Sequence, residues 1–93
     1  MAFFLKDPGA SIDYAVEWGA GYLGAQTIAA SQWSVEPDEP AGVHVGATLA
    51  APTRTGATLN GGVPGQVYRV RNRVTLSDGR IDERSIALRV EQR

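Results

Sequence analysis

The side chains that could carry out chemistry are few and far apart in this 93-residue chain. It contains no cysteine and a single histidine, His44, so it offers no thiolate zinc site, no cysteine nucleophile and no histidine cluster. Asp13 and Glu17 are separated by four positions, which along one face of a strand is about 13 Å. That separation does not suit the paired carboxylates of a glycosidase. We therefore predict no catalytic residue, no cofactor and no metal site.

The segment 36–42 combines three acidic residues with two prolines. Carboxylates can bind calcium, but the spacing and the glycine of an EF-hand loop are absent. Prolines also do not fit the middle of a sheet. The composition predicts an acidic, proline-rich surface loop.

Three arginines, Arg69, Arg71 and Arg73, alternate in the C-terminal third. On a strand they would share one face at intervals of about 6.6 Å. Such a stripe can bind an anion or an acidic partner. It can equally be a solvent face that Glu83 and Glu91 partly neutralise. Nucleic acid is not an expected partner, since no recognition helix and no interleaved aromatic residues accompany the stripe.

A second candidate surface is the apolar run Phe3, Phe4 and Leu5. Successive side chains of a strand point to opposite sides, so we expect one or two of the three to be exposed and available to a partner. No run approaches the roughly 18 apolar residues of a membrane span. The first seven residues also lack the pattern of a secretory signal. These features favour a soluble protein made in a reducing cytoplasm, with no membrane partner.

The elements that would position these residues show a period of two. Residues 12–18 and 26–35 predict strands, the second with a bulge near Ser31 and Gln32. Residues 43–50 predict a weak edge strand and residues 55–59 another short one. The clearest pattern is a hairpin of residues 67–76 and 86–90. A three-residue loop, 77–79, places Val70 opposite Ile86, so that both apolar sets face one core.

The same register sets Tyr68 opposite Leu88 and Arg73 opposite Glu83. Six or seven short strands with frequent turns, and no convincing helix, predict an antiparallel immunoglobulin-like β-sandwich. We expect residues 1–93 to form one domain, with residues 1–7 as an N-terminal strand or arm. Tyr68 is expected to form a tyrosine corner, and Trp33 to be the tryptophan between the sheets.

Charge is distributed unevenly along the chain. Residues 1–53 contain one basic and six acidic side chains, whereas residues 54–93 contain eight arginines and four acidic side chains. This asymmetry predicts either two oppositely charged surfaces of one small domain or a surface that stacks head-to-tail with another copy or a partner.

The sequence resembles the gp77-like family of small phage structural proteins, the fibre–tail adaptors. The resemblance rests on the order and spacing of KDPGASIDY (6–14), Trp18, TIAASQWSV (27–35), GGVPGQVY (61–68), NRVT (72–75) and GRIDERS (79–85). It implies an immunoglobulin-like sandwich without catalytic residues. It also implies a place in the virion after synthesis in the bacterial host, beside tail, fibre or neck proteins in a homo- or hetero-oligomeric assembly.

The first hypothesis is therefore a virion adaptor that attaches to other components through residues 3–5 and the arginine stripe. A capsid decoration or neck protein is an alternative within the same class. A carbohydrate-binding or adhesion module is an alternative of a different class, and it predicts aromatic side chains exposed in a groove. An enzyme would need a constellation of acid, base or nucleophile that the sequence does not supply.

Overall fold

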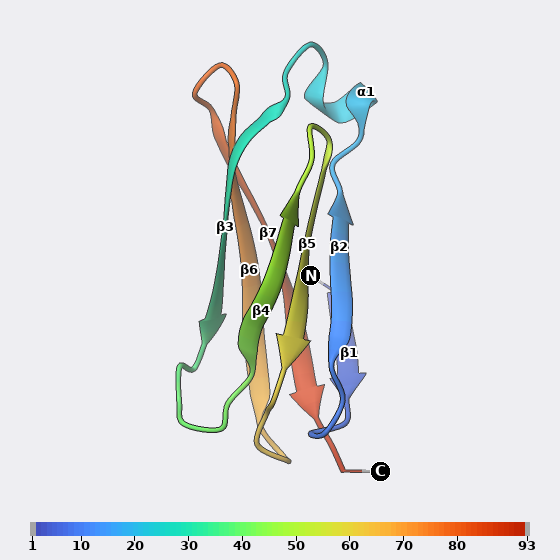
Figure 1. The fold of residues 1–93 in the computed structure, drawn as a ribbon, viewed down its shortest axis with the longest axis vertical. Helices are drawn as coiled ribbons and strands as arrows, with labels where there is room; N and C mark the ends of the chain where they lie inside the picture. Colours follow the sequence, from blue (N-terminus) through green and yellow to red (C-terminus); the bar gives the residue numbers. More distant parts are fainter. Residues whose placement is uncertain (1, 93) are drawn as a thin grey trace.

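Seven β-strands and one helical turn occupy residues 2–92, the part of the chain that the computed structural model describes (Figure 1). In chain order the elements are β1 (Ala2–Lys6), β2 (Ile12–Glu17), α1 (Ala20–Leu23), β3 (Ile28–Glu36), β4 (His44–Ala50), β5 (Arg54–Asn60), β6 (Val67–Leu76) and β7 (Ile81–Val90).

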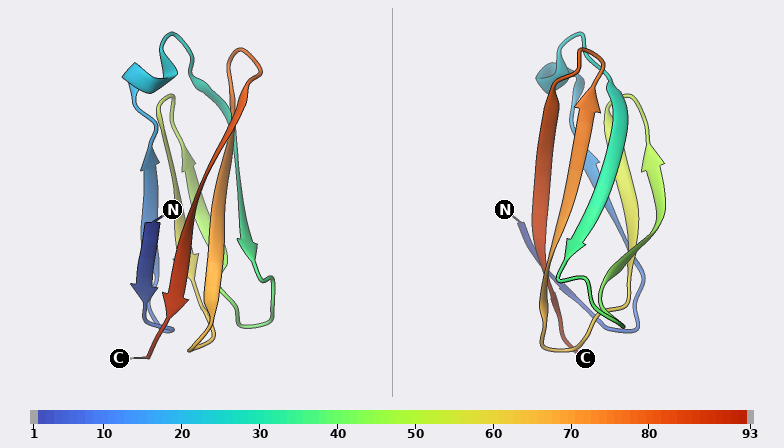
Figure 2. Two further views of the ribbon diagram at one scale, coloured as in Figure 1. Left: turned by 180° about the vertical axis from the view of Figure 1, so that it is seen from behind. Right: turned by 90° about the vertical axis from the view of Figure 1, so that its left-hand side faces the viewer.

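The strands form two sheets that pack face to face (Figure 2). One sheet has the order β1-β7-β6-β3 and the other the order β2-β5-β4. All neighbours are antiparallel except β1, which runs parallel to β7. Sheets of four and three strands with these crossovers have the architecture of an immunoglobulin-like sandwich. The predicted fold class is confirmed.

The C-terminal hairpin has the register expected from the sequence. Val70 pairs with Ile86 and Tyr68 with Leu88. The loop of residues 77–79 closes with Gly79 at φ 91°, and the Gly79 N–H donates to the Leu76 carbonyl at 2.9 Å. A left-handed residue at this position is what a three-residue hairpin loop requires, and glycine adopts it without a steric penalty.

One local expectation is wrong. The bulge in β3 lies between Ile28 and Ala30, not near Ser31 and Gln32. The alternation of side chains along the strand requires one extra residue but does not say where it lies. It lies at the start of β3, where the Ile28 N–H donates to the carbonyl of Pro52. Between β2 and β3, residues 20–23 form a single helical turn, in which the Leu23 N–H donates to the Gly19 carbonyl.

Both tryptophans lie between the sheets, the predicted Trp33 and also Trp18, which is the more deeply buried of the two. Trp18 is 1% exposed, and its ring lies under the guanidinium of Arg84, 4.5 Å from the ring centroid. Trp33 does contact the opposite sheet, with its ring 6.0 Å from that of Tyr14. Trp33 is partly buried and lies on β3, an edge strand of its sheet.

A chain of buried hydrogen bonds joins the two sheets. The indole N–H of Trp18 donates to Thr55 Oγ1 at 3.1 Å, and the Thr55 hydroxyl donates to Asn72 Oδ1 at 2.5 Å. The Asn72 amide then donates to Ser31 Oγ at 2.8 Å and to the Gln32 carbonyl at 3.1 Å. Thr55 and Asn72 are completely buried. Paired in this way, the polar groups avoid the desolvation penalty of unsatisfied donors and acceptors.

Tyr68 forms the predicted tyrosine corner. Its hydroxyl accepts the Val63 N–H at 3.0 Å and donates to Glu39 Oε1 at 2.6 Å. The second bond attaches the loop that follows β3 to the start of β6. Burial raises the pKa of Tyr68, and the hydrogen bond to Glu39 raises it further.

We predict that Asn72→Leu, which keeps the number and branching of the side-chain heavy atoms, lowers the free energy of unfolding by about 2–4 kcal/mol. The loss arises because the buried Thr55 hydroxyl would lose its acceptor, and Ser31 and the Gln32 carbonyl would lose their donor. Urea unfolding at pH 7 measures the change. Gln32→Ala, an exposed substitution on β3, should stay within about 0.5 kcal/mol. Equal effects from the two variants would contradict the role of the network.

Tyr68→Phe should cost about 1–3 kcal/mol at pH 8, because it removes one bond to a backbone N–H and one to a carboxylate. The raised pKa adds a pH dependence. Above about pH 10 the unfolded chain ionises this tyrosine while the folded chain keeps it protonated, so stability falls as the pH rises. The difference between wild type and Tyr68→Phe should therefore shrink from pH 9 to pH 11. A constant difference in urea unfolding across this range would show that the tyrosine does not titrate as we expect.

Candidate partner-binding face

Phe3 and Leu5 lie on the outer face of the four-stranded sheet. The parallel register sets Phe3 beside Ala87 and Leu5 beside Arg89. On β7 these positions alternate with Ile86 and its buried neighbours, and residues side by side in adjacent strands share a face. Phe3 is 57% exposed and Leu5 46%. Together they form an apolar area on the outside of the sandwich.

Phe4 points to the other side of β1, where its ring lies 6.0 Å from that of Tyr14. It is nevertheless 43% exposed. All three residues of the run are thus exposed, where we expected one or two. β1 is the edge strand of its sheet, so no further strand covers its outer side.

Lys6 anchors this edge strand. The side chain is 2% exposed, and its ammonium donates to the carbonyls of Asp7 at 2.9 Å and Gly61 at 2.7 Å. Burial lowers the pKa of Lys6, while the nearby carboxylate of Asp7 opposes the shift. From the sequence, Lys6 was only the charge that ends the apolar run. In the structure it fixes β1 to the loop before β6.

The arginine stripe lies on the same outer face, on β6. Arg71 is half-buried between two carboxylates, Glu36 at 3.4 Å and Glu83 at 3.8 Å. Arg69 and Arg73 are exposed and form no ion pair with the residues that the structure describes. The stripe is therefore partly neutralised at its centre and retains two guanidinium groups that are open to a partner.

Two shallow depressions mark this face. One lies near the apolar area and is lined by Glu36, Pro37, Val67, Tyr68, Arg69 and Ala87. The other lies across β3, β6 and β7 and is lined by Gln32, Trp33, Ser34, Arg71, Arg73 and Glu83.

Val67 and Arg89 are neighbours on this face, and sequence analysis did not assign them to it. Val67 is 48% exposed and pairs with Arg89. Val67 could have been assigned to this face from the sequence, because it occupies the same alternating positions as the three arginines. The place of Arg89 beside Leu5 depends on the pairing of β1 with β7, which has no local signal. The face thus combines the apolar area and the arginine stripe without a gap.

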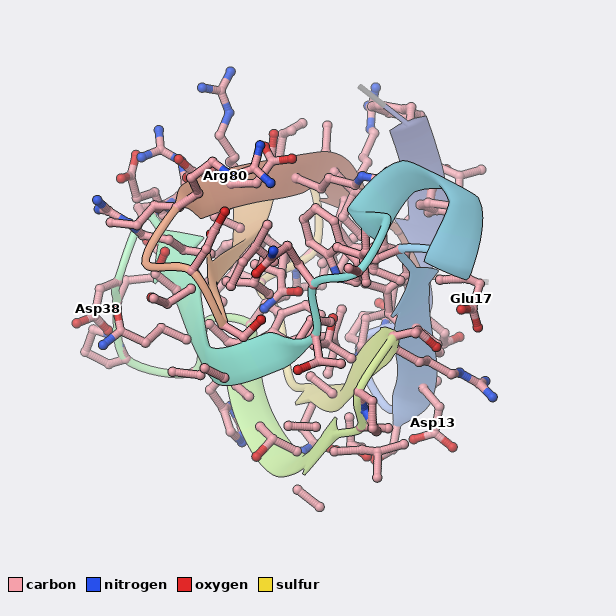
Figure 3. All side chains as sticks on the ribbon, turned by 90° about the horizontal axis from the view of Figure 1, so that it is seen from above. Asp13, Glu17, Asp38 and Arg80 are labelled. Carbon is pink, nitrogen blue, oxygen red and sulfur yellow. The ribbon has the colours of Figure 1, made fainter. Side chains whose placement is uncertain are left out.

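The acidic residues of the first half do not gather into a site. Figure 3, which looks along the long axis, shows Asp13 and Glu17 projecting outward from β2, and Asp38 on another side of the molecule. Asp13 accepts a hydrogen bond from Thr58 at 2.7 Å. Within residues 2–92 no group of three or more histidine and carboxylate side chains could hold a metal ion. No helix in that range is long and apolar enough to cross a membrane.

The family model described as "Podophage GP4 fiber-tail adaptor protein gp77" matches residues 6–89. The chain belongs to this family. No curated protein matches it. Membership confirms the resemblance drawn from the sequence motifs and indicates the structural role of a phage fibre–tail adaptor. The match includes the arginine stripe and begins just after Phe3–Leu5.

The arginines of this adaptor should contribute little to its stability. Arg69→Gln, Arg71→Gln and Arg73→Gln are each expected to change the free energy of unfolding by less than about 1 kcal/mol, because ion pairs at an exposed surface are weak. Chemical denaturation of the three variants measures this. A loss above about 2 kcal/mol at any position would mean that the arginine maintains the fold rather than a surface for a partner.

Proposed function

We propose that the chain is a non-enzymatic virion component that attaches one tail or fibre protein to another through the outer face of the β1-β7-β6-β3 sheet. The observation that supports this most strongly is the coincidence of two features on one rigid face. Phe3 and Leu5 are exposed beside β7, and Arg69 and Arg73 are open on β6. The neighbouring proteins would be tail, fibre or neck components, and the site of action the virion, after synthesis in the host cytoplasm.

The mechanism is adhesion between preformed surfaces. Burying an exposed Phe or Leu side chain contributes about 1.5–3 kcal/mol, so the apolar area holds the contact. Complementary charges contribute more to orientation and to the rate of encounter than to affinity. The open arginines therefore favour a partner whose matching surface is acidic around an apolar centre. Because the face lies on paired strands, little conformational entropy is lost on binding.

The observations favour this reading over a carbohydrate-binding module. Such a module needs flat aromatic rings exposed in a groove. Trp18 and Tyr68 are buried, and Tyr14 and Trp33 are partly buried between the sheets. Exposed Phe3 lies beside Ala87 on the outer face of the sheet. A capsid decoration or neck position would use the same face, and the partner captured in the experiment below decides between these positions.

The double variants Phe3→Ser/Leu5→Ser and Arg69→Glu/Arg73→Glu should each weaken attachment at least about tenfold, or about 1.4 kcal/mol. The assay is co-sedimentation of the purified chain with isolated tails, fibres and capsids of its phage, at rising chain concentration. Raising the salt concentration should weaken the wild type but change the arginine variant less, because screening acts on the charges.

The matched controls lie on the outer face of the other sheet. Leu49→Ser removes an equally exposed apolar side chain, and Arg54→Glu reverses an exposed arginine. Both should bind as the wild type does. Equal loss in the controls, or wild-type binding by both face variants, would refute the proposed face. Binding to no virion component would refute the adaptor function itself.

A further inference from the structure

Three of the four edge strands carry features that discourage pairing with another chain. Edge strands present unpaired backbone groups, and proteins protect them with charges, bulges or short length. β2 carries Asp13 and Glu17. β4 has an extra residue between Val45 and Thr48 that interrupts its register. β1 has five residues.

β3 is the exception. After the irregularity between Ile28 and Ala30, residues 30–36 pair with β6 in an uninterrupted register. Seven residues at about 3.3 Å each give roughly 23 Å of open edge. The chain has no charged residue from position 18 to position 35, and Glu36 at the end of the strand is the first. β3 is the longest edge strand of the two sheets and the least protected.

We propose that β3 pairs with β3 of a second copy of the chain, antiparallel and about a two-fold axis near Trp33. In this register Gln32 faces Ser34 of the second copy, and Ala30 faces Glu36 of the second copy. No like charges are opposed, so the pairing avoids the repulsion that destabilises cross-strand pairs. Glu36 of each copy enters the outer face that carries Arg73 of the other, where the charge is of opposite sign.

The pairing would extend the four-stranded sheet into an eight-stranded sheet shared by two copies. A two-fold axis perpendicular to the sheet keeps both outer faces on one side, as in isologous dimers generally. The two arginine stripes and the two apolar areas would then lie on one continuous surface. This pairing depends only on the edge strands and not on the proposed adaptor function, so the isolated chain is enough to test it.

Sedimentation velocity of the purified chain at about 1–500 μM tests the proposal. We expect a species of twice the 9.9 kDa chain mass that dissociates on dilution. The double variant Gln32→Lys/Ser34→Lys should shift the dissociation constant at least tenfold toward monomer, because it gathers four lysines around the axis. Both positions are exposed, and circular dichroism with thermal unfolding verifies that the variant folds.

The control is Ala47→Lys/Leu49→Lys. It places two lysines at exposed positions of β4, an edge strand of the three-stranded sheet. It should dimerise as the wild type does. A wild type that stays monomeric at 500 μM overturns the proposal. A dimer that persists in the Gln32→Lys/Ser34→Lys variant also overturns it, as does a dimer that is lost only in the Ala47→Lys/Leu49→Lys variant. Amide hydrogen exchange gives a second readout: residues 30–36 should gain protection with concentration, and a dimer without that gain would place the contact elsewhere.

Discussion

The hydrogen bond from Thr55 to Asn72 is the constraint on which the rest of the structure depends. It joins the two sheets inside the core of a chain that has no cysteine and therefore no disulfide to do so. Because side chains alternate along a strand, an inward Asn72 obliges Arg71 and Arg73 to point outward. A slip of one residue would bury the arginines and expose the asparagine. The buried network thus determines which face of β6 carries charge.

Away from this central network, two further polar anchors hold one end of the sandwich. Tyr68 attaches the acidic loop through Glu39, and Lys6 attaches β1 through the carbonyl of Gly61. Each anchor is a buried polar group with its partners in place, and each positions part of the outer face. Lys6 holds the strand that carries Phe3 and Leu5, so these side chains are presented from a fixed strand although they are exposed. A lysine that is costly to bury therefore determines where the apolar area lies.

Features that depend on neighbouring residues could be predicted from the sequence. The hairpin register followed from the alternation of Val70 and Ile86 together with the loop that ends at Gly79, and the tyrosine corner from the position of Tyr68. Features that depend on distant partners could not. The pairing of β1 with β7 has no local signal, and it alone brings Leu5 beside Arg89. The burial of Lys6 and the deeper burial of Trp18 compared with Trp33 depend on how the strands assemble into sheets.

The parallel pairing of β1 with β7 has a mechanical consequence. The first residues of β1 lie beside Ile86, while the last residue of β7 lies beside Lys6. Tension applied between the start of β1 and the end of β7 therefore acts along the ladder, in shear. Its hydrogen bonds then share the load, whereas a pair pulled from one end would open one bond at a time. Resistance to such tension is a rate property that depends on the barrier to unfolding, and the molecule, 43 Å long and about 20 Å across, has its long strands aligned with that direction.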